Sequence, residues 1–351
     1  MIFFILNSNY KNFSKLHYGA SDQNRTGIPA LARPCTNHCT TPATHKLYHI
    51  YIYLSIIFLL FLLVIVWVMY YNGVVNLKRG CKGDIMKTRI ISAIIVILLS
   101  IPVFYFGGTL YKVAFFLIAL QALREFINVR EKRKEFPNII KLIAYICLTL
   151  FYFSVDINES LIINFDFRII TSLLLVLFFP IILYNDKNKY NINDCCYMLG
   201  GVLLIASSMV LANLYRNIGL RVIVYLFLVT ILTDTFAYFT GMLIGRHKLL
   251  ESVSPKKTWE GFIGGALVAT FTGTVFYTTV INTSIEIPVI VMFTLFLSII
   301  GQFGDLFFSS IKRYYKVKDF SNLMPGHGGV LDRLDSIIFV LLAFSLFMNL
   351  I

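Results

Sequence analysis

The sequence predicts an all-α, polytopic integral membrane protein, and three observations support that prediction. Of the 351 residues, 58% are hydrophobic and only 14% are charged. A water-soluble domain of this length does not need so much apolar surface, so this composition argues against one or two soluble domains. The apolar residues also gather into runs about one membrane span long, and the basic residues fall between those runs.

Ten apolar runs approach the roughly 20 residues that a helix needs to cross a bilayer. Nine of them follow Met86, and the short link Gly107-Gly108 makes two of the nine a tight helical hairpin. We therefore expect about nine transmembrane helices from Met86, plus one extra N-terminal span if the run at 50–70 inserts. The approximate cores of the ten runs are residues 50–70, 90–106, 109–127, 138–155, 168–184, 197–214, 220–241, 261–281, 288–309 and 335–351.

The net charge of +13 is distributed over alternate loops, as the positive-inside rule expects. The loops 124–137, 245–260 and 312–333 are rich in Lys and Arg, whereas the loops 156–168 and 282–287 are poor in them. We expect the basic loops to be cytoplasmic, in a bacterial-type inner or cell membrane. Because these residues orient helices among membrane lipids, they do not indicate a nucleic-acid partner.

The chain divides into three predicted parts: an N-terminal extension (1–85), N-terminal transmembrane helices (86–215) and a transmembrane region with the polar cytoplasmic loops (216–351), which we expect to be catalytic. Residues 1–47 are polar and lack an amphipathic period. We interpret residues 1–85 as a lineage-specific extension or as the product of a start codon assigned too far upstream. The six cysteines form no zinc or disulfide pattern.

The first of three polar clusters lies inside an apolar run and centres on Asp234. On a helix Asp234, Tyr238 and Gly241 share one face. An aspartate within a membrane span is a functional candidate by default. Two other interpretations stay open for Asp234: a hydrogen-bonded packing carboxylate near a helix end, or a residue of an ion-coupled transporter.

The second cluster is the string Ser254-Pro255-Lys256-Lys257-Thr258-Trp259-Glu260-Gly261. Two lysines beside hydroxyl groups offer a phosphate site, with the ammonium groups acting as point charges. The alternative is that Lys256 and Lys257 anchor a helix end at lipid headgroups, where each basic residue adds about 1 kcal/mol of attraction.

The third cluster begins with Asp305, Ser309 and Lys312, which form one stripe at positions i, i+4 and i+7 of a helix. A carboxylate, a hydroxyl and an ammonium in line can hold a metal and a phosphate together. Asp332 and Asp335, spaced i, i+3, share one face where the last helix begins. Asp305 and Asp332 would supply hard oxygen ligands for Mg²⁺, which usually binds one or two carboxylates plus substrate phosphates.

A glycine-rich segment lies between these two groups, at residues 326–329. Its glycines can turn successive backbone N–H groups toward an anion, because glycine adopts the required φ angles at little cost. His327 in the same segment is either a base or a histidine that orders the loop.

The residues from Ser309 to Asp335 together resemble the signature of phosphatidate cytidylyltransferases (CDP-diacylglycerol synthases). About a dozen positions of that signature match over 27 residues, and the Ser254–Gly261 string resembles the same family. The resemblance covers residues 234–336 and the layout of nine spans from Met86, and it does not cover residues 1–85. The matching residues read Ser309-Ser310-Ile311-Lys312-Arg313, four residues, Lys318-Asp319, and then Pro325-Gly326-His327-Gly328-Gly329-Val330-Leu331-Asp332-Arg333-Leu334-Asp335.

The resemblance implies transfer of CMP from CTP to phosphatidate, which gives CDP-diacylglycerol and diphosphate. It implies that Asp305 and Asp332 bind Mg²⁺, with a second cation left open, and that Ser309, Lys312 and Lys257 are catalytic. A homodimer is also left open. The expected substrate-binding residues are Lys256, Arg313, Lys318, His327, Gly328, Gly329, Arg333 and Asp234.

Two alternatives remain at this point. A related CTP-dependent membrane enzyme that acts on another lipid, such as an isoprenoid alcohol kinase or an archaeal-type lipid cytidylyltransferase, would use a similar set of loops. A cation-coupled transporter lined by Asp234 and Asp305 would instead predict two matching halves with broken helices. The sequence shows no such internal repeat.

Overall fold

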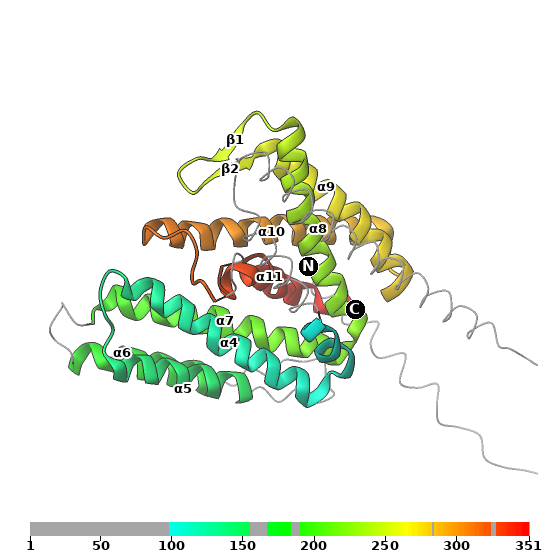
Figure 1. Ribbon diagram of the computed structural model, residues 1–351. Helices are drawn as coiled ribbons and strands as arrows, with labels where there is room; N and C mark the ends of the chain where they lie inside the picture. The colour runs from blue at the N-terminus through cyan, green and yellow to red at the C-terminus, as the bar shows by residue number, and fades with distance from the viewer. Residues whose placement is uncertain (1–97, 155–166, 184–189, 283, 324–327, 351) are drawn as a thin grey trace, which may run out of the picture. The chain divides into compact units, whose positions relative to one another are not determined.

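The computed structural model describes residues 98–154, 167–183, 190–282, 284–323 and 328–350 (Figure 1). All of them belong to one of two compact units into which the chain divides, Leu54–Ile351. The predicted extra span at 50–70 and the predicted boundary at residue 85 lie outside the described residues.

Each predicted apolar run from residue 109 onward corresponds to a helix. Residues 98–106, the described part of the run before it, are helical too, and this helix ends at the predicted Gly107-Gly108 link. The elements are α4 (Gly108–Glu131), α5 (Asn138–Ser154), α6 (Phe167–Leu183), α7 (Ile192–Ile218), α8 (Leu220–Ile244), β1 (Lys248–Leu250), β2 (Ser254–Thr258), α9 (Trp259–Phe276), a π-helical turn (Tyr277–Ile281), α10 (Ile287–Tyr314), α11 (Leu331–Phe344) and a 3₁₀ turn (Ser345–Leu350).

Four of the described helices are long and apolar enough to cross a membrane: Ile192–Ile218, Leu220–Ile244, Trp259–Ile281 and Ile287–Tyr314. Two shorter helices, Asn138–Ser154 and Arg168–Ile182, are apolar as well. A mostly helical protein with four helices able to span a membrane is therefore confirmed for the described residues, whereas nine spans stay a prediction. Helix α11 has only 14 residues, which is short of the roughly 20 that span a bilayer.

The outward face of α9 is apolar along its length. Ile263, Leu267 and Phe271 recur every four residues and are 54%, 62% and 71% exposed. A stripe of this kind is unusual on a water-soluble protein. It is the expected surface of a helix whose solvent is lipid, because hydrocarbon tails are as apolar as the side chains.

The 245–260 loop contains a two-stranded antiparallel sheet that the sequence did not predict. Strand β1 pairs with β2, with Lys248 opposite Thr258 and Leu250 opposite Ser254. In Figure 1 the hairpin lies beyond the ends of α8 and α9, which it connects. These two helices approach closely at Gly265, where an added Cβ would lie 2.6 Å from the backbone oxygen of Thr233.

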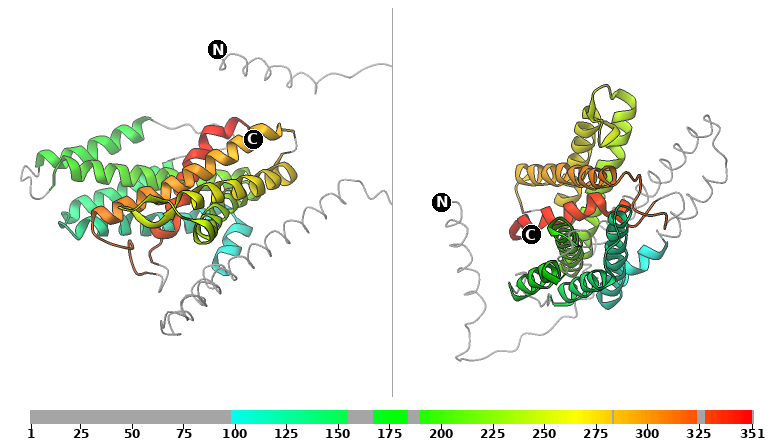
Figure 2. Two further views of the ribbon diagram at one scale, coloured as in Figure 1. Left: turned by 90° about the horizontal axis from the view of Figure 1, so that it is seen from above. Right: turned by 90° about the vertical axis from the view of Figure 1, so that its left-hand side faces the viewer.

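Helix α11 is packed against α10, α8, α7 and α4 (Figure 1), and Figure 2 shows it beside α10 in both views. Buried tyrosines tie these helices together by donating to helix carbonyls, as a buried phenol group requires. The hydroxyl of Tyr215 in α7 donates to the Leu341 oxygen at 2.9 Å, and that of Tyr111 in α4 donates to the Ala212 oxygen at 3.3 Å. Helix α11, whose first turn contains the end of the predicted signature, thus packs against helices from both halves of the described chain.

Candidate active site

The predicted stripe on α10 exists and is joined to the hairpin. The Ser309 hydroxyl donates to Asp305 Oδ1 at 3.2 Å, as their i, i+4 spacing on the helix predicts. Asp305 Oδ2 lies 2.5 Å from Lys257 Nζ at the end of β2. The second and third polar clusters of the sequence therefore meet through one ion pair.

The two adjacent lysines of β2 do not share an environment. Lys257 is half-buried and pairs with Asp305, whereas the side chain of Lys256 is exposed. Successive side chains of a strand point to opposite faces, so only one of two neighbours can face α10. The strand therefore gives two adjacent lysines, which look equivalent in the sequence, different surroundings.

Lys312, one helical turn after Ser309, is buried with only 8% of its surface exposed. Its Nζ lies 2.8 Å from Asp332 Oδ1 and 4.0 Å from Asp335 Oδ2, both on α11. It also lies 5.3 Å from the centre of the Phe320 ring. A buried ammonium needs such partners, because an unpaired charge away from water is costly.

The first polar cluster reaches the same place from α8. The carboxylate of Asp234 interacts electrostatically with Asp305, Lys257 and Arg333, and that of Asp335 interacts with Asp305 and Asp234. Three carboxylates from three helices, α8, α10 and α11, therefore lie close enough to repel one another. The nearby lysines offset part of this repulsion.

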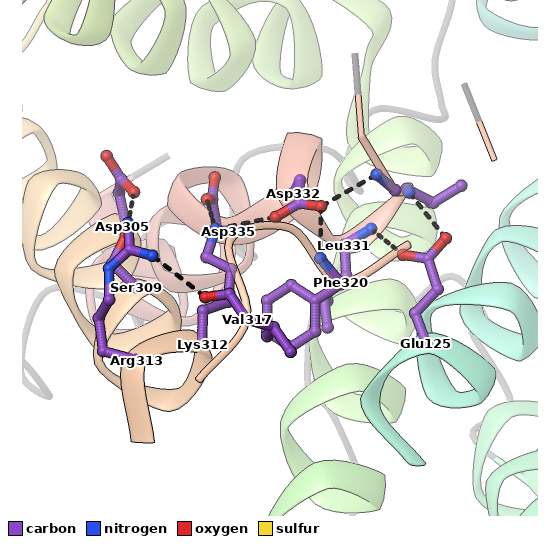
Figure 3. A network of polar contacts seen from close by, with 12 residues as sticks. Glu125, Asp305, Ser309, Lys312, Arg313, Val317, Phe320, Leu331, Asp332 and Asp335 are labelled. Atoms are coloured by element: carbon purple, nitrogen blue, oxygen red, sulfur yellow. Dashed lines mark hydrogen bonds and ion pairs between the residues drawn. The ribbon is translucent and has the colours of Figure 1, made fainter. Parts of the chain in front are cut away.

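Asp332 is held from several sides (Figure 3). Its Oδ2 accepts the backbone N–H of Phe320 at 2.8 Å and that of Gly329 at 2.9 Å, while Oδ1 accepts Lys312. Gly328 adopts a φ of +85°, a conformation that favours glycine, and an added Cβ there would lie 3.0 Å from Asp332 Oδ2. The Gly329 N–H is thus directed at the chain's own carboxylate, and anion binding by the remaining glycine-loop N–H groups stays a prediction.

Three more of the predicted substrate-binding residues, Arg313, Lys318 and Arg333, differ in their surroundings. The guanidinium of Arg313 donates to the backbone oxygens of Val253 at 3.2 Å and Val317 at 3.1 Å, so it ties the hairpin turn to the end of α10. Lys318 is exposed, and Arg333 is exposed while it interacts with Asp234. His327 lies outside the described residues.

The donor set suits a hard divalent cation. In the ranges that the structure describes, no three His, Cys, Asp or Glu side chains converge to hold a metal ion. A site with two protein carboxylates fits Mg²⁺, which takes its remaining ligands from water and substrate phosphates. Among the described residues, Asp332 Oδ1 accepts a hydrogen bond from the Lys312 ammonium, and a carboxylate oxygen can accept a second interaction.

Two acidic residues join this network without having been predicted as site residues. Asp335 is part of the signature and is buried beside Lys312. Glu125 on α4 is 0% exposed and accepts hydrogen bonds from the loop before α11. The sequence did contain a signal for Glu125: its carboxylate lies at the end of a predicted span, and an ionisable residue in a membrane helix is a functional candidate.

The fold and site together define a helical membrane protein that gathers aspartates and lysines at one place beside its apolar spans. Its residues 87–351 match the family model described as "Cytidylyltransferase family". The chain belongs to this family.

Curated relatives are similar over most of their length. A phosphatidate cytidylyltransferase from Staphylococcus haemolyticus is 36% identical over 257 residues, which cover 73% of this chain and 96% of the relative. Proteins of the same name from Staphylococcus epidermidis and Staphylococcus aureus are 36% identical over 256 residues and 33% identical over 260 residues, with the same coverage of both chains.

Proposed function

We propose that this chain transfers CMP from CTP to phosphatidate, which forms CDP-diacylglycerol and releases diphosphate. The observation that carries the proposal is the convergence of Lys257 and Lys312 with Asp305 and Asp332 beside apolar helices. Charged groups of both signs at this depth suit a lipid phosphate and a nucleotide better than they suit lipid anchoring. The relatives named phosphatidate cytidylyltransferase support the same substrates.

The reaction is an in-line displacement at the α-phosphorus of CTP. A phosphate oxygen of phosphatidate attacks that phosphorus, a new P–O–P bond forms, and the bond to the β-phosphate breaks as diphosphate leaves. The attacking oxygen is already anionic at neutral pH, so no strong general base is needed. Positioning and neutralisation of charge carry most of the catalysis in such transfers.

The lysines are suited to the neutralising role. Lys257 and Lys312 each bridge to a carboxylate, so their ammonium groups are fixed in place before a phosphate arrives. Ser309, bonded to Asp305, adds a hydroxyl donor on the same helical stripe. Lys256 of the hairpin, Arg313 at the end of α10 and Lys318 in the loop after it are exposed and would attract the triphosphate.

Asp305 and Asp332 are the residues that would hold Mg²⁺. When bound, the ion would neutralise phosphate charge and make the α-phosphorus more electrophilic. Asp234 and Asp335 both interact electrostatically with Asp305. Their carboxylate oxygens could serve a second cation.

The same proposal includes nine spans from Met86, in a bacterial inner or cell membrane, with the hairpin and the signature loop in the cytoplasm. CTP would then enter from the cytoplasm and phosphatidate sideways from the lipid. The apolar outer face of α9 supports contact with lipid. The basic character of the loops 245–260 and 312–333 supports the sidedness.

The test uses purified protein, Mg²⁺ and CTP labelled either at the α- or at the γ-phosphate. With phosphatidate we expect the α-label, and not the γ-label, to enter the lipid. Transfer of the γ-label to an isoprenoid alcohol would identify a kinase instead. If the α-label does not enter phosphatidate but does enter an archaeal-type ether-lipid phosphate, the protein is an archaeal-type lipid cytidylyltransferase.

A further inference from the structure

The loop between α10 and α11 folds back on itself before α11 starts. Phe320 and Gly329 both donate their backbone N–H groups to Asp332 Oδ2, so residues nine positions apart share one oxygen. We call the paired segments 320–321 and 329–331 the loop neck. The glycine-rich part of the signature lies between these two segments.

A second carboxylate holds the neck from outside. Glu125 accepts the Ser321 hydroxyl at 2.8 Å on one side of the neck, and the N–H groups of Val330 at 3.0 Å and Leu331 at 2.8 Å on the other. Gln121, one turn earlier on α4, donates to the same carboxylate at 3.0 Å. Figure 3 shows Glu125 reaching the neck from the side opposite Lys312.

Such a carboxylate is expensive to bury unless donors surround it. Glu125 is 0% exposed, and the donors around it are uncharged. Hydrogen bonds to an ionised acceptor are about twice as strong as neutral ones. Two of the donors are the N–H groups of Val330, the N-cap of α11, and of Leu331, its first residue. Both groups lie at the positive end of the helix, where N–H groups have no partner within the helix.

The neck is also closely packed against Glu125 at Gly329. A Cβ at Gly329 would overlap the Glu125 carboxylate and would lie 2.8 Å from the Ser321 hydroxyl oxygen. The absence of a side chain at residue 329 therefore lets α4 approach the signature loop. This close contact joins residues about 200 positions apart in the chain.

We propose that Glu125 is a positioning residue for the transfer reaction, on the basis of the function proposed above. It closes the loop neck from α4 and thereby fixes Asp332, whose Oδ2 depends on Phe320 and Gly329 being in place. Lys312 is fixed in turn through Asp332. The hydrogen bonds of Glu125 run to Gln121 and to the neck, so its effect on rate passes through the neck.

The experiment compares Glu125→Gln with Glu131→Gln in the full-length protein in detergent. The Glu125→Gln change keeps the side-chain volume but replaces one acceptor oxygen by an NH₂ group, which would face an N–H donor of the neck. Glu131 lies on the same helix and pairs with Lys141 at 2.8 Å, away from the neck. Turnover per folded molecule, the thermal midpoint, and backbone hydrogen exchange of residues 320–331 are measured for both variants.

We expect Glu125→Gln to lower turnover about tenfold to a hundredfold, as misplacement of a reacting group by an ångström does. Its thermal midpoint should stay within about 3 °C of the wild type, while exchange of residues 320–331 becomes faster. Glu131→Gln should leave turnover and loop exchange unchanged. Wild-type turnover or unchanged loop exchange in Glu125→Gln would overturn the proposal.

A milder variant covers the case in which Glu125→Gln does not fold. Ser321→Ala removes one donor at the neck and leaves the buried carboxylate with three others. It should accelerate exchange of the loop and lower turnover several-fold, and no change in either would again overturn the proposal. Hydrogen exchange needs no substrate, so the role of Glu125 in the neck is tested even if the protein proves inactive on phosphatidate.

Discussion

At the residue scale, this site is built from cations and carboxylates that pair across different elements. Lys257 pairs with Asp305 and Lys312 with Asp332. Each pair joins two different elements, so the position of each charged group depends on its partner element as well as on its own. A phosphate that enters this site would meet ammonium groups whose positions are already set, which lowers the ordering cost of binding.

Replacement of the proposed metal-binding carboxylates should remove activity and keep the fold. Asp332→Asn and Asp305→Asn preserve side-chain volume but remove one negative charge each, so turnover should fall to background. The thermal midpoint should change little in Asp305→Asn, whose side chain is partly exposed, and should fall in Asp332→Asn, which leaves the buried Lys312 without its nearest charged partner. If both residues hold one ion, the double variant should lose no more than either single variant. Turnover measured over a Mg²⁺ titration checks this. Near-wild-type rates at limiting Mg²⁺ in both single variants would contradict the metal assignment.

Loss of the hairpin lysine should affect catalysis more than stability. The Lys257–Asp305 pair is partly exposed, with about a quarter of each side chain accessible, and such pairs contribute about 0–1 kcal/mol to folding. Lys257→Ala should therefore keep its thermal midpoint but lose at least about tenfold in turnover or in apparent CTP affinity. Steady-state kinetics over a range of CTP concentrations measures both.

The matched control is Lys132→Ala, since Lys132 is an exposed lysine in the 124–137 loop with no place in the site. Its kinetics should equal those of the wild type. Lys312→Ala should lose turnover as Lys257→Ala does, but its thermal midpoint should fall as well, because the buried Asp332 loses its charged partner. Equal losses in all three variants would favour general attraction to lipid headgroups over a role in the reaction.

At the element scale, the position of the hairpin depends on the close packing of α8 and α9. The two helices that carry it meet where Gly265 faces Thr233 and Ala237. Arg313 then ties the hairpin turn to α10 by donating to the Val253 oxygen. Lys257 reaches Asp305 only because these contacts set the hairpin beside α10.

A methyl group at the α8–α9 contact should destabilise the protein. In Gly265→Ala the new Cβ would lie 2.6 Å from the Thr233 oxygen and 2.8 Å from the Ala237 Cβ, and overpacking of this kind costs about 1–3 kcal/mol. Gly200→Ala on α7 is the control, because nothing lies within 4 Å of its added Cβ. Thermal unfolding in detergent should show a lower midpoint for the first variant and an equal or higher one for the second.

At the scale of the whole molecule, α11 makes one site out of distant segments. It packs against helices from both halves of the described chain, so its N-terminus meets Glu125 of α4 as well as Lys312 of α10. No local pattern in the sequence predicts contacts between residues this far apart in the chain. The arrangement requires that all the loops that meet at this site lie on one side of the membrane.

That sidedness can be measured with single cysteines and a membrane-impermeant thiol reagent. In a background without reactive native cysteines, Lys132→Cys and Lys248→Cys should be labelled only in inverted vesicles. Ser284→Cys, in the loop poor in basic residues, should be labelled only in intact spheroplasts. Labelling of Lys248→Cys and Ser284→Cys from the same side would contradict the proposed topology.

The sequence by itself determined the helices and the relations within each of them. Apolar runs predicted α5 to α11 because membrane spans are long and uniform in composition. The i, i+4 spacing of Asp305 and Ser309 predicted their contact, since helical periodicity is a local property. The strands β1 and β2 escaped prediction because they are only three and five residues long and lack the apolar alternation that marks a half-buried strand.

Only the tertiary structure decided which charges meet. Strand alternation turned Lys257, and not Lys256, toward Asp305. Packing of α4 against α11 brought Glu125 to Val330, a contact across 205 positions. Periodicity reports which face of its own element a residue occupies, but not which element faces it. The choice of partner depends on how several helices pack at once, and no single segment of the sequence contains that information.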